Sequence, residues 1–175
     1  MIFMPKIIAF ILEMTVSFIA LWFLTFLSTL LHELGHALAY KLATGDRHWH
    51  IRVGWGKRLL NTKALTVNLL VFDGLFIPGE KKIDTNRKRI TTLLGGPAAS
   101  LVLFLVLLIL RIGGVSSQSD LLADGVLEFF LNYAFFLNLF ILLLAVAPIH
   151  YFHGEVRGLE SDGLQIIHAM KKNRD

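Results

Sequence analysis

The chain contains no cysteine, which excludes both a disulfide framework and any metal site built on thiolates. A metal ion in this protein would therefore have to be bound by histidine, aspartate or glutamate. Charged residues are also scarce, at 17% of the 175 residues, and they are nearly absent from three long stretches. The sequence has no repeat of solenoid period and no low-complexity segment. These absences make a single domain, residues 1–175, the expected organisation.

Hydrophobic residues make up 55% of the chain, and the mean hydropathy is +0.64. Ordinary soluble domains are less apolar, and long apolar runs are typical of segments that lie in a bilayer. A helix needs ~20 residues to cross the hydrocarbon core. The apolar runs therefore predict three transmembrane helices, at about residues 7–43, 91–113 and 125–148. We expect an integral membrane protein that is mainly α-helical.

The segment between the first two predicted helices has a different pattern. Residues 48–79 are rich in β-forming residues, and Asp73-Gly74 is typical of a hairpin turn. We predict a small membrane-associated β region of two to four strands here. Non-helical backbone at membrane depth must be covered by protein or line a wet cavity. Residues 150–175 are expected to form a tail on the cytoplasmic side, with a short helix around His168.

Basic residues are concentrated in residues 44–90 and in the tail after residue 150, whereas the connection 112–124 has no lysine or arginine. Cytoplasmic loops of membrane proteins carry the excess of lysine and arginine. This distribution predicts a multi-pass cell-membrane protein with its N-terminus outside and its C-terminus in the cytoplasm. Because the basic segment adjoins two predicted spans, we interpret its charge as a topology signal, and we expect a lipid bilayer and no nucleic acid as partner.

The stretch "HELGH" places ionisable groups near the end of the first apolar run. His32 and His36 are one helical turn apart, so both imidazoles project from one face and can bind one zinc ion. Glu33, beside them, could accept the proton of an attacking water as general base. Ionisable groups within a membrane span are costly and usually functional. The alternative is an inert, hydrogen-bonded pair of histidines at the interface.

Two histidines do not complete a hydrolytic zinc site, which normally has three protein ligands and a water. Spacing alone does not choose the third ligand. The candidates are Asp162, His150, His153, His48, His50 and His168.

"HELGH" on the first helix resembles the zinc motif of the site-2 protease family, the intramembrane zinc metalloproteases. "LATGDRHWHIRVGWGKRLL" resembles the family's passage into a membrane-associated β region, and "LLGGPAAS" its Gly-Pro-x-x-Asn opening of the next span. "LNLFILLLAVAPI" followed by "SDGLQI" resembles its last core helix and Asp-Gly. In that family this aspartate is the third zinc ligand, so the resemblance implies Asp162.

The chain also departs from the family pattern. Ser100 replaces the asparagine of Gly-Pro-x-x-Asn, and Ala145 stands where the family has an asparagine before the proline. Asn138 fits an earlier asparagine of the same helix and is our candidate for binding unwound substrate backbone; a polar helix–helix contact is the alternative. The segment from Pro148 to Asp162 is longer than in the family, which keeps His150 and His153 as rival ligands.

Motif and resemblance together predict an intramembrane zinc metalloprotease that hydrolyses peptide bonds in or near transmembrane segments of membrane protein substrates. Its Zn²⁺ would be bound by His32, His36 and Asp162, with Glu33 as the catalytic base. The chain has no room for an appended peptide-binding domain, so substrates would be filtered by the core or by an accessory membrane protein. The alternative is a catalytically inactive membrane scaffold or partner-binding protein that retains the fold; a metal transporter ranks last.

Overall fold

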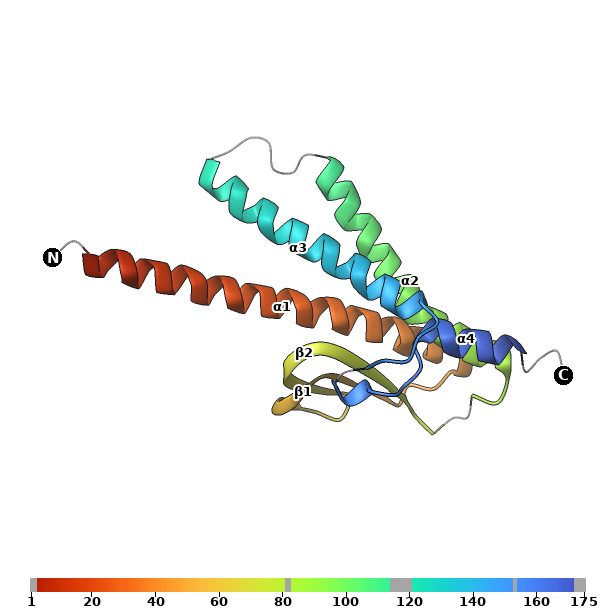
Figure 1. The fold of residues 1–175 in the computed structure, drawn as a ribbon. Coiled ribbons are helices and arrows are strands. Elements are labelled where there is room, and N and C mark those ends of the chain that lie inside the picture. The colour runs from red at the N-terminus through yellow and green to blue at the C-terminus, as the bar shows by residue number, and fades with distance from the viewer. Residues whose placement is uncertain (1–2, 81–82, 114–120, 153, 172–175) are drawn as a thin grey trace.

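The computed structural model describes residues 3–80, 83–113, 121–152 and 154–171. The fold is mainly helical, with a two-stranded sheet. Figure 1 shows the C-terminal half of α1 between the β-hairpin and the pair α2 and α3, and α4 packs against α2 and α3. In chain order the elements are α1 (Phe3–Thr44), β1 (Trp49–Asn61), β2 (Leu65–Pro78), α2 (Asn86–Ile112), α3 (Leu121–Val146), η1 (Gly154–Val156) and α4 (Asp162–Lys171).

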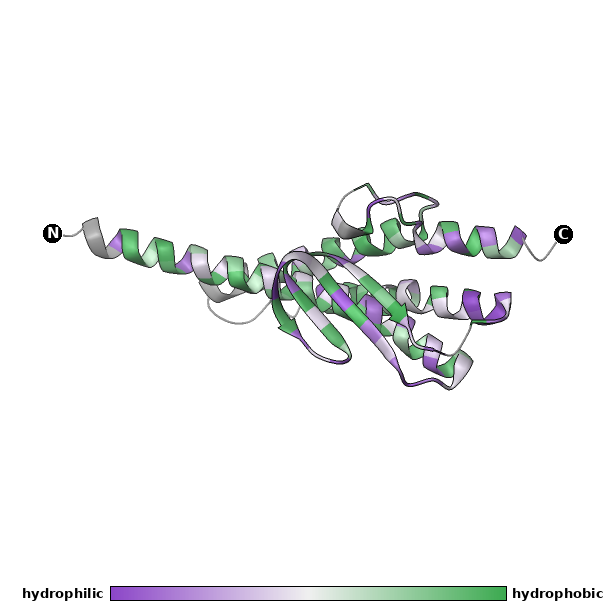
Figure 2. Ribbon diagram, turned by 90° about the horizontal axis from the view of Figure 1, so that it is seen from below, coloured by the Kyte–Doolittle hydropathy of each residue, from purple (hydrophilic) through white to green (hydrophobic). Residues whose placement is uncertain are grey.

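The helices α1, α2 and α3 are each long and apolar enough to cross a membrane. Hydrophobic residues run along most of their length, as Figure 2 shows. The three predicted long apolar helices are confirmed, with ends that lie within a few residues of those observed, and their crossing of a membrane stays a prediction. Helix α2 begins before its apolar run because the side chain of Thr85 caps it, accepting a hydrogen bond from the backbone N–H of Lys88.

Helix α1 is unusually long for a single span. Its 42 residues extend over ~63 Å at 1.5 Å per residue. This is about twice the thickness of a hydrocarbon core, so α1 must tilt or project from a bilayer. The "HELGH" stretch lies in the C-terminal third of the helix, within the half that the other elements cover.

The hairpin confirms the predicted β region and limits it to two antiparallel strands. It curls on itself, since Ile51 of β1 pairs both with Phe76 and with Leu65 of β2. The prediction of a turn at Asp73-Gly74 is wrong, because both residues lie inside β2 and the chain reverses between the two strands, after Asn61. The lack of a side chain at Gly74 leaves space for Glu33, because a Cβ at this position would overlap the Glu33 carboxyl group.

The apolar core lies between α1 and the hairpin. It contains Ala37 of α1 with Ile51, Val53, Val67 and Val71 of the strands. The indole Nε1 of Trp22 donates a hydrogen bond to the carbonyl oxygen of Leu69, at 2.6 Å. The hairpin is thereby held along the same helix that carries the two histidines.

Helices α1 and α2 approach each other at a pair of glycines. A Cβ on Gly35 would overlap the carbonyl oxygen of Gly95, and a Cβ on Gly95 would overlap that of Gly35. Small residues at a crossing let membrane helices approach closely. This crossing brings residues 92–100 of α2 against the "HELGH" turn of α1.

Candidate metal centre

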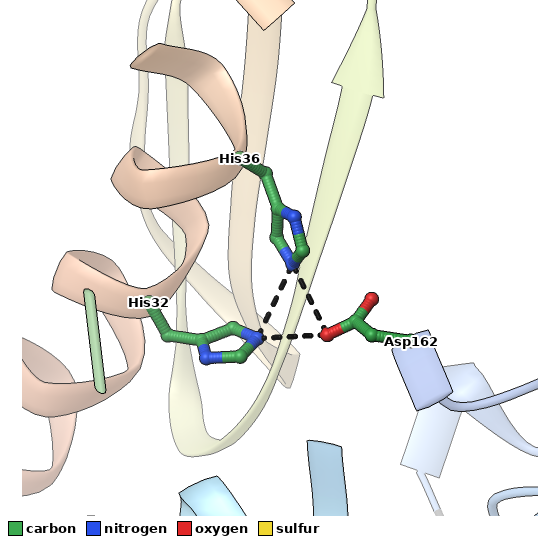
Figure 3. Close-up of side chains that lie close together, drawn as sticks. All are labelled: His32, His36 and Asp162. Carbon is green, nitrogen blue, oxygen red and sulfur yellow. Dashed lines mark hydrogen bonds and ion pairs between the residues drawn. The ribbon is translucent and has the colours of Figure 1, made fainter. Parts of the chain in front are cut away.

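His32, His36 and Asp162 converge on one point, although the aspartate is far from the histidines in sequence. The Oδ2 atom of Asp162 lies 3.3 Å from Nε2 of His32 and 3.3 Å from Nε2 of His36. The two Nε2 atoms are also 3.3 Å apart, so the three atoms form a nearly equilateral triangle (Figure 3). Ligands bound at ~2.0–2.1 Å in tetrahedral geometry are about 3.3–3.4 Å apart. This buried group could therefore hold a metal ion.

The orientation of both imidazoles is set from α2. Nδ1 of His36 lies 2.8 Å from the backbone oxygen of Thr92, which can only accept, and 3.3 Å from the backbone nitrogen of Gly96; the shorter of the two contacts requires the proton on Nδ1. Nδ1 of His32 lies 2.9 Å from Oγ of Ser100. Metal-binding histidines generally donate their second ring N–H in this way, which leaves the other nitrogen free for the metal. Ser100, the residue that departs from the family pattern, thus contacts a predicted ligand directly.

Gly96 makes room for the group of three side chains. A Cβ at this position would overlap the Nε2 atoms of both His32 and His36. The backbone of α2 at Gly96 therefore forms one wall of the site. Because Gly96 has no side chain, the Nε2 atoms of both histidines fit against this wall. This observation fits an occupant at the centre of the triangle.

Asp162 is positioned by its neighbours in "SDG". Oγ of Ser161 donates to the carbonyl oxygen of Ala147 at 2.5 Å and accepts from the N–H of Leu164 at 3.2 Å, which caps α4. A Cβ on Gly163 would overlap the backbone oxygen of Val146, so the first turn of α4 rests closely on the end of α3. Asp162 is thereby directed toward α1.

Two opposing effects act on the Asp162 carboxyl group. Burial favours its neutral form, but hydrogen bonds and charge interactions with the two histidines outweigh burial. Together they lower its pKa from 3.8 to about 2. The side chain is therefore an anionic carboxylate near neutral pH, as a metal ligand must be.

The other histidine candidates do not join this group. His150 is exposed, with its backbone bridged to Glu160, and His168 pairs with the Glu160 carboxylate. His48 is exposed and contacts Asp46, while His50 bonds to the hydroxyl of Thr66. His153 lies outside the described residues.

Glu33 is buried beside the two histidines, at the wall that α1 shares with β2. Gly74 of β2 leaves the space that the carboxyl group of Glu33 occupies. Glu33 lines a cavity of about 700 Å³ together with His32, His36 and Asp162. Glu33 is therefore not one of the three candidate ligands, but its side chain can contact a molecule bound in the cavity.

Asn138 is buried in the contact between α3 and α1. Its Nδ2 donates to Oγ of Ser28 at 3.0 Å and to the carbonyl oxygen of Ala134 at 2.8 Å. It is not among the residues that line the cavities beside the metal group. The bond from Asn138 to Ser28 is a polar contact between two helices, the alternative given above for this asparagine. A role of Asn138 in substrate binding stays a prediction.

Tyr151 is a site residue that the sequence reasoning missed. It lines the cavity beside Glu33 and Asp162. Burial raises the pKa of its phenol, and the nearby charges of Asp162 and Glu33 raise it further, so the O–H remains a donor. The only signal in the sequence was the unusual length of the segment between Pro148 and Asp162, in which it lies.

Comparisons with protein-family models, with curated proteins and with solved structures found no match to this chain. The resemblance to site-2 proteases therefore depends on the sequence motifs alone.

Proposed function

We propose that this chain is an intramembrane zinc metalloprotease, which cleaves peptide bonds in or near the membrane-spanning segments of other proteins. Zinc is the proposed metal because two imidazoles, one carboxylate and an open cavity make up a typical hydrolytic zinc site. The observation that carries the proposal is the 3.3 Å triangle of His32, His36 and Asp162, with Glu33 in the wall of the adjoining cavity.

Bound by these three residues, a zinc ion would supply Lewis acidity that makes water a nucleophile near neutral pH. Glu33 would accept the proton of the attacking water and pass it to the leaving amine. Tyr151 would donate its O–H to the carbonyl oxygen as negative charge develops there. Ser100 and Thr92 would keep the two imidazoles oriented throughout.

The proposed location of the chemistry follows from the apolar helices and the distribution of charge. The metal group lies toward the end of α1 that leads into the basic segment 44–90. By the preference of basic loops for the cytoplasm, this is the cytoplasmic side, with the N-terminus outside. Substrates are then membrane proteins that reach the cavity from the bilayer or from its cytoplasmic face.

A cleavage assay tests the catalytic role of Glu33. The chain is co-expressed with a panel of single-span membrane proteins tagged at both ends, and fragments are followed by immunoblot. Glu33→Gln is expected to slow cleavage by ~10²–10⁴-fold because it removes the base. Glu13→Gln, an exposed change in the same helix, is the matched control and should cleave normally. Equal cleavage by both variants would refute the protease proposal, and an intact panel with the native chain would favour the scaffold alternative.

Elemental analysis of purified protein tests the metal separately from activity. The native chain and Glu33→Gln are expected to contain about one zinc per chain. Asp162→Ala and His32→Ala should lose it, whereas His48→Ala, which changes an exposed histidine, should retain it. Full zinc content in Asp162→Ala would show that the third ligand has been assigned wrongly.

A further inference from the structure

A second, smaller cavity adjoins the larger one at Glu33. It has a volume of about 90 Å³ and lies between α1, β2 and α3. His32, Glu33, Gly74, Tyr151 and Val156 line both this cavity and the larger one. A chain that crosses the metal group in the larger cavity would therefore have the smaller one directly beside its reacting bond.

Most of the lining of the smaller cavity is apolar, and its polar residues outside the metal cavity are Thr29 and Asp73. Ile141, Leu144 and Ala145 contribute from α3, Phe72 from β2, and Val156 from η1. At about 90 Å³ the smaller cavity has room for only a few water-sized groups. This is the size of a valine or leucine side chain, and neither a glycine nor an aromatic residue would fill it well.

We propose that this cavity is a specificity subsite for an aliphatic side chain, of valine or leucine size, on the substrate residue next to the scissile bond. The inference rests on the proposed protease function and adds to it a preference that the metal group alone does not imply. The larger cavity then takes the extended main chain around the bond, since its 700 Å³ is the size of a typical ligand site.

Ala145 determines how deep the subsite is. Its side chain is 2% exposed and ends at the cavity, so a longer side chain would grow into this space. The family pattern has asparagine at this position, which would place a larger polar group in the cavity. Alanine leaves the space open and apolar, as an aliphatic occupant requires.

Cleavage of paired substrates tests the size preference. A single-span substrate that the native chain cuts is varied at the two residues flanking the cut, with glycine, alanine, leucine and phenylalanine at each. At one flanking position the native chain should prefer leucine over glycine by ~10–100-fold. Ala145→Leu should reverse this order, with the glycine or alanine substrate cut at close to the native rate. Leu143→Phe adds the same three carbons on an exposed part of α3 and should leave the order unchanged.

A thiol-labelling experiment tests the subsite in a variant that is not expected to cleave substrate. Because the chain has no cysteine, Ala145→Cys places a unique thiol in the subsite of the Glu33→Gln protein. A small methanethiosulfonate should label it, and the leucine substrate peptide should slow labelling several-fold more than its glycine counterpart. Leu143→Cys should be labelled equally with either peptide.

The two experiments separate the inference from the function on which it rests. If Ala145→Cys resists labelling or is protected equally by both peptides, the subsite is refuted. An unchanged size preference in Ala145→Leu would also refute it, even with an active protease. If the native chain cuts no member of the panel, the labelling is repeated with leucine-containing and glycine-containing versions of one panel segment. Selective protection by the leucine version would then leave the subsite as a binding site while the protease proposal fails.

Discussion

Replacing Ser100 by alanine removes the acceptor that holds the proton of His32 on Nδ1, at 2.9 Å in the native chain. In the metal-free variant this proton can move to Nε2, where Oδ2 of Asp162 lies 3.3 Å away. Metal binding then requires the proton to return to Nδ1, where it has lost its acceptor. A buried donor left without an acceptor costs about 1–3 kcal/mol, which corresponds to a loss of about 5–150-fold in affinity.

Competition with a zinc chelator measures this affinity in purified, detergent-solubilised protein. We expect Ser100→Ala to bind zinc ~10–100-fold more weakly than the native chain, as is usual when a partner of a metal-bound histidine is lost. Ser28→Ala is the matched control because it removes a similarly buried serine hydroxyl, one that bonds to Asn138 and not to a metal ligand. Equal zinc affinity in the two variants would refute the role assigned to Ser100.

Three further changes address the space and the donors around the site. Gly96→Ala should abolish zinc binding because its Cβ would overlap both ligand nitrogens, whereas Gly125→Ala, with open space around it, should bind zinc normally; elemental analysis decides. Gly35→Ala should lower stability by about 1–3 kcal/mol or more by overpacking the helix crossing, which thermal unfolding in detergent measures, and an unchanged melting temperature would contradict that contact. Tyr151→Phe should reduce kcat by ~10–100-fold while zinc content and KM stay the same, and an effect on KM alone would assign Tyr151 to substrate binding.

The helices could be predicted because a bilayer imposes a simple requirement on sequence. A span needs about 20 apolar residues, and three runs satisfy it, so fold class and element order follow directly. The position of the turn in the β region was harder to predict, because Asp73-Gly74 has the composition of a hairpin turn. The structure uses Gly74 instead to leave room for Glu33, a contact with a residue 41 positions earlier that no local pattern contains.

The candidate metal ligands were also visible in the sequence, but not the features that orient them. The motif names His32 and His36, and the resemblance names Asp162. Ser100 and Gly96 contact these ligands only because α1 and α2 cross at Gly35 and Gly95. Such a crossing depends on the fit of two helix surfaces, and each glycine by itself is compatible with many crossings.

The long segment before Asp162 is folded so that its two ends lie together. The backbone N–H of Ser161 bonds to the carbonyl oxygen of Ile149 at 2.9 Å, and that of Tyr151 to Leu159 at 2.9 Å. These bonds join residues near the two ends of the segment, so the start of α4, with Asp162, lies close to the end of α3. The residues between them contribute Tyr151 and Val156 to the wall between the two cavities. The length that made Asp162 doubtful as a ligand is therefore what supplies a phenol and an apolar surface beside the proposed reacting bond.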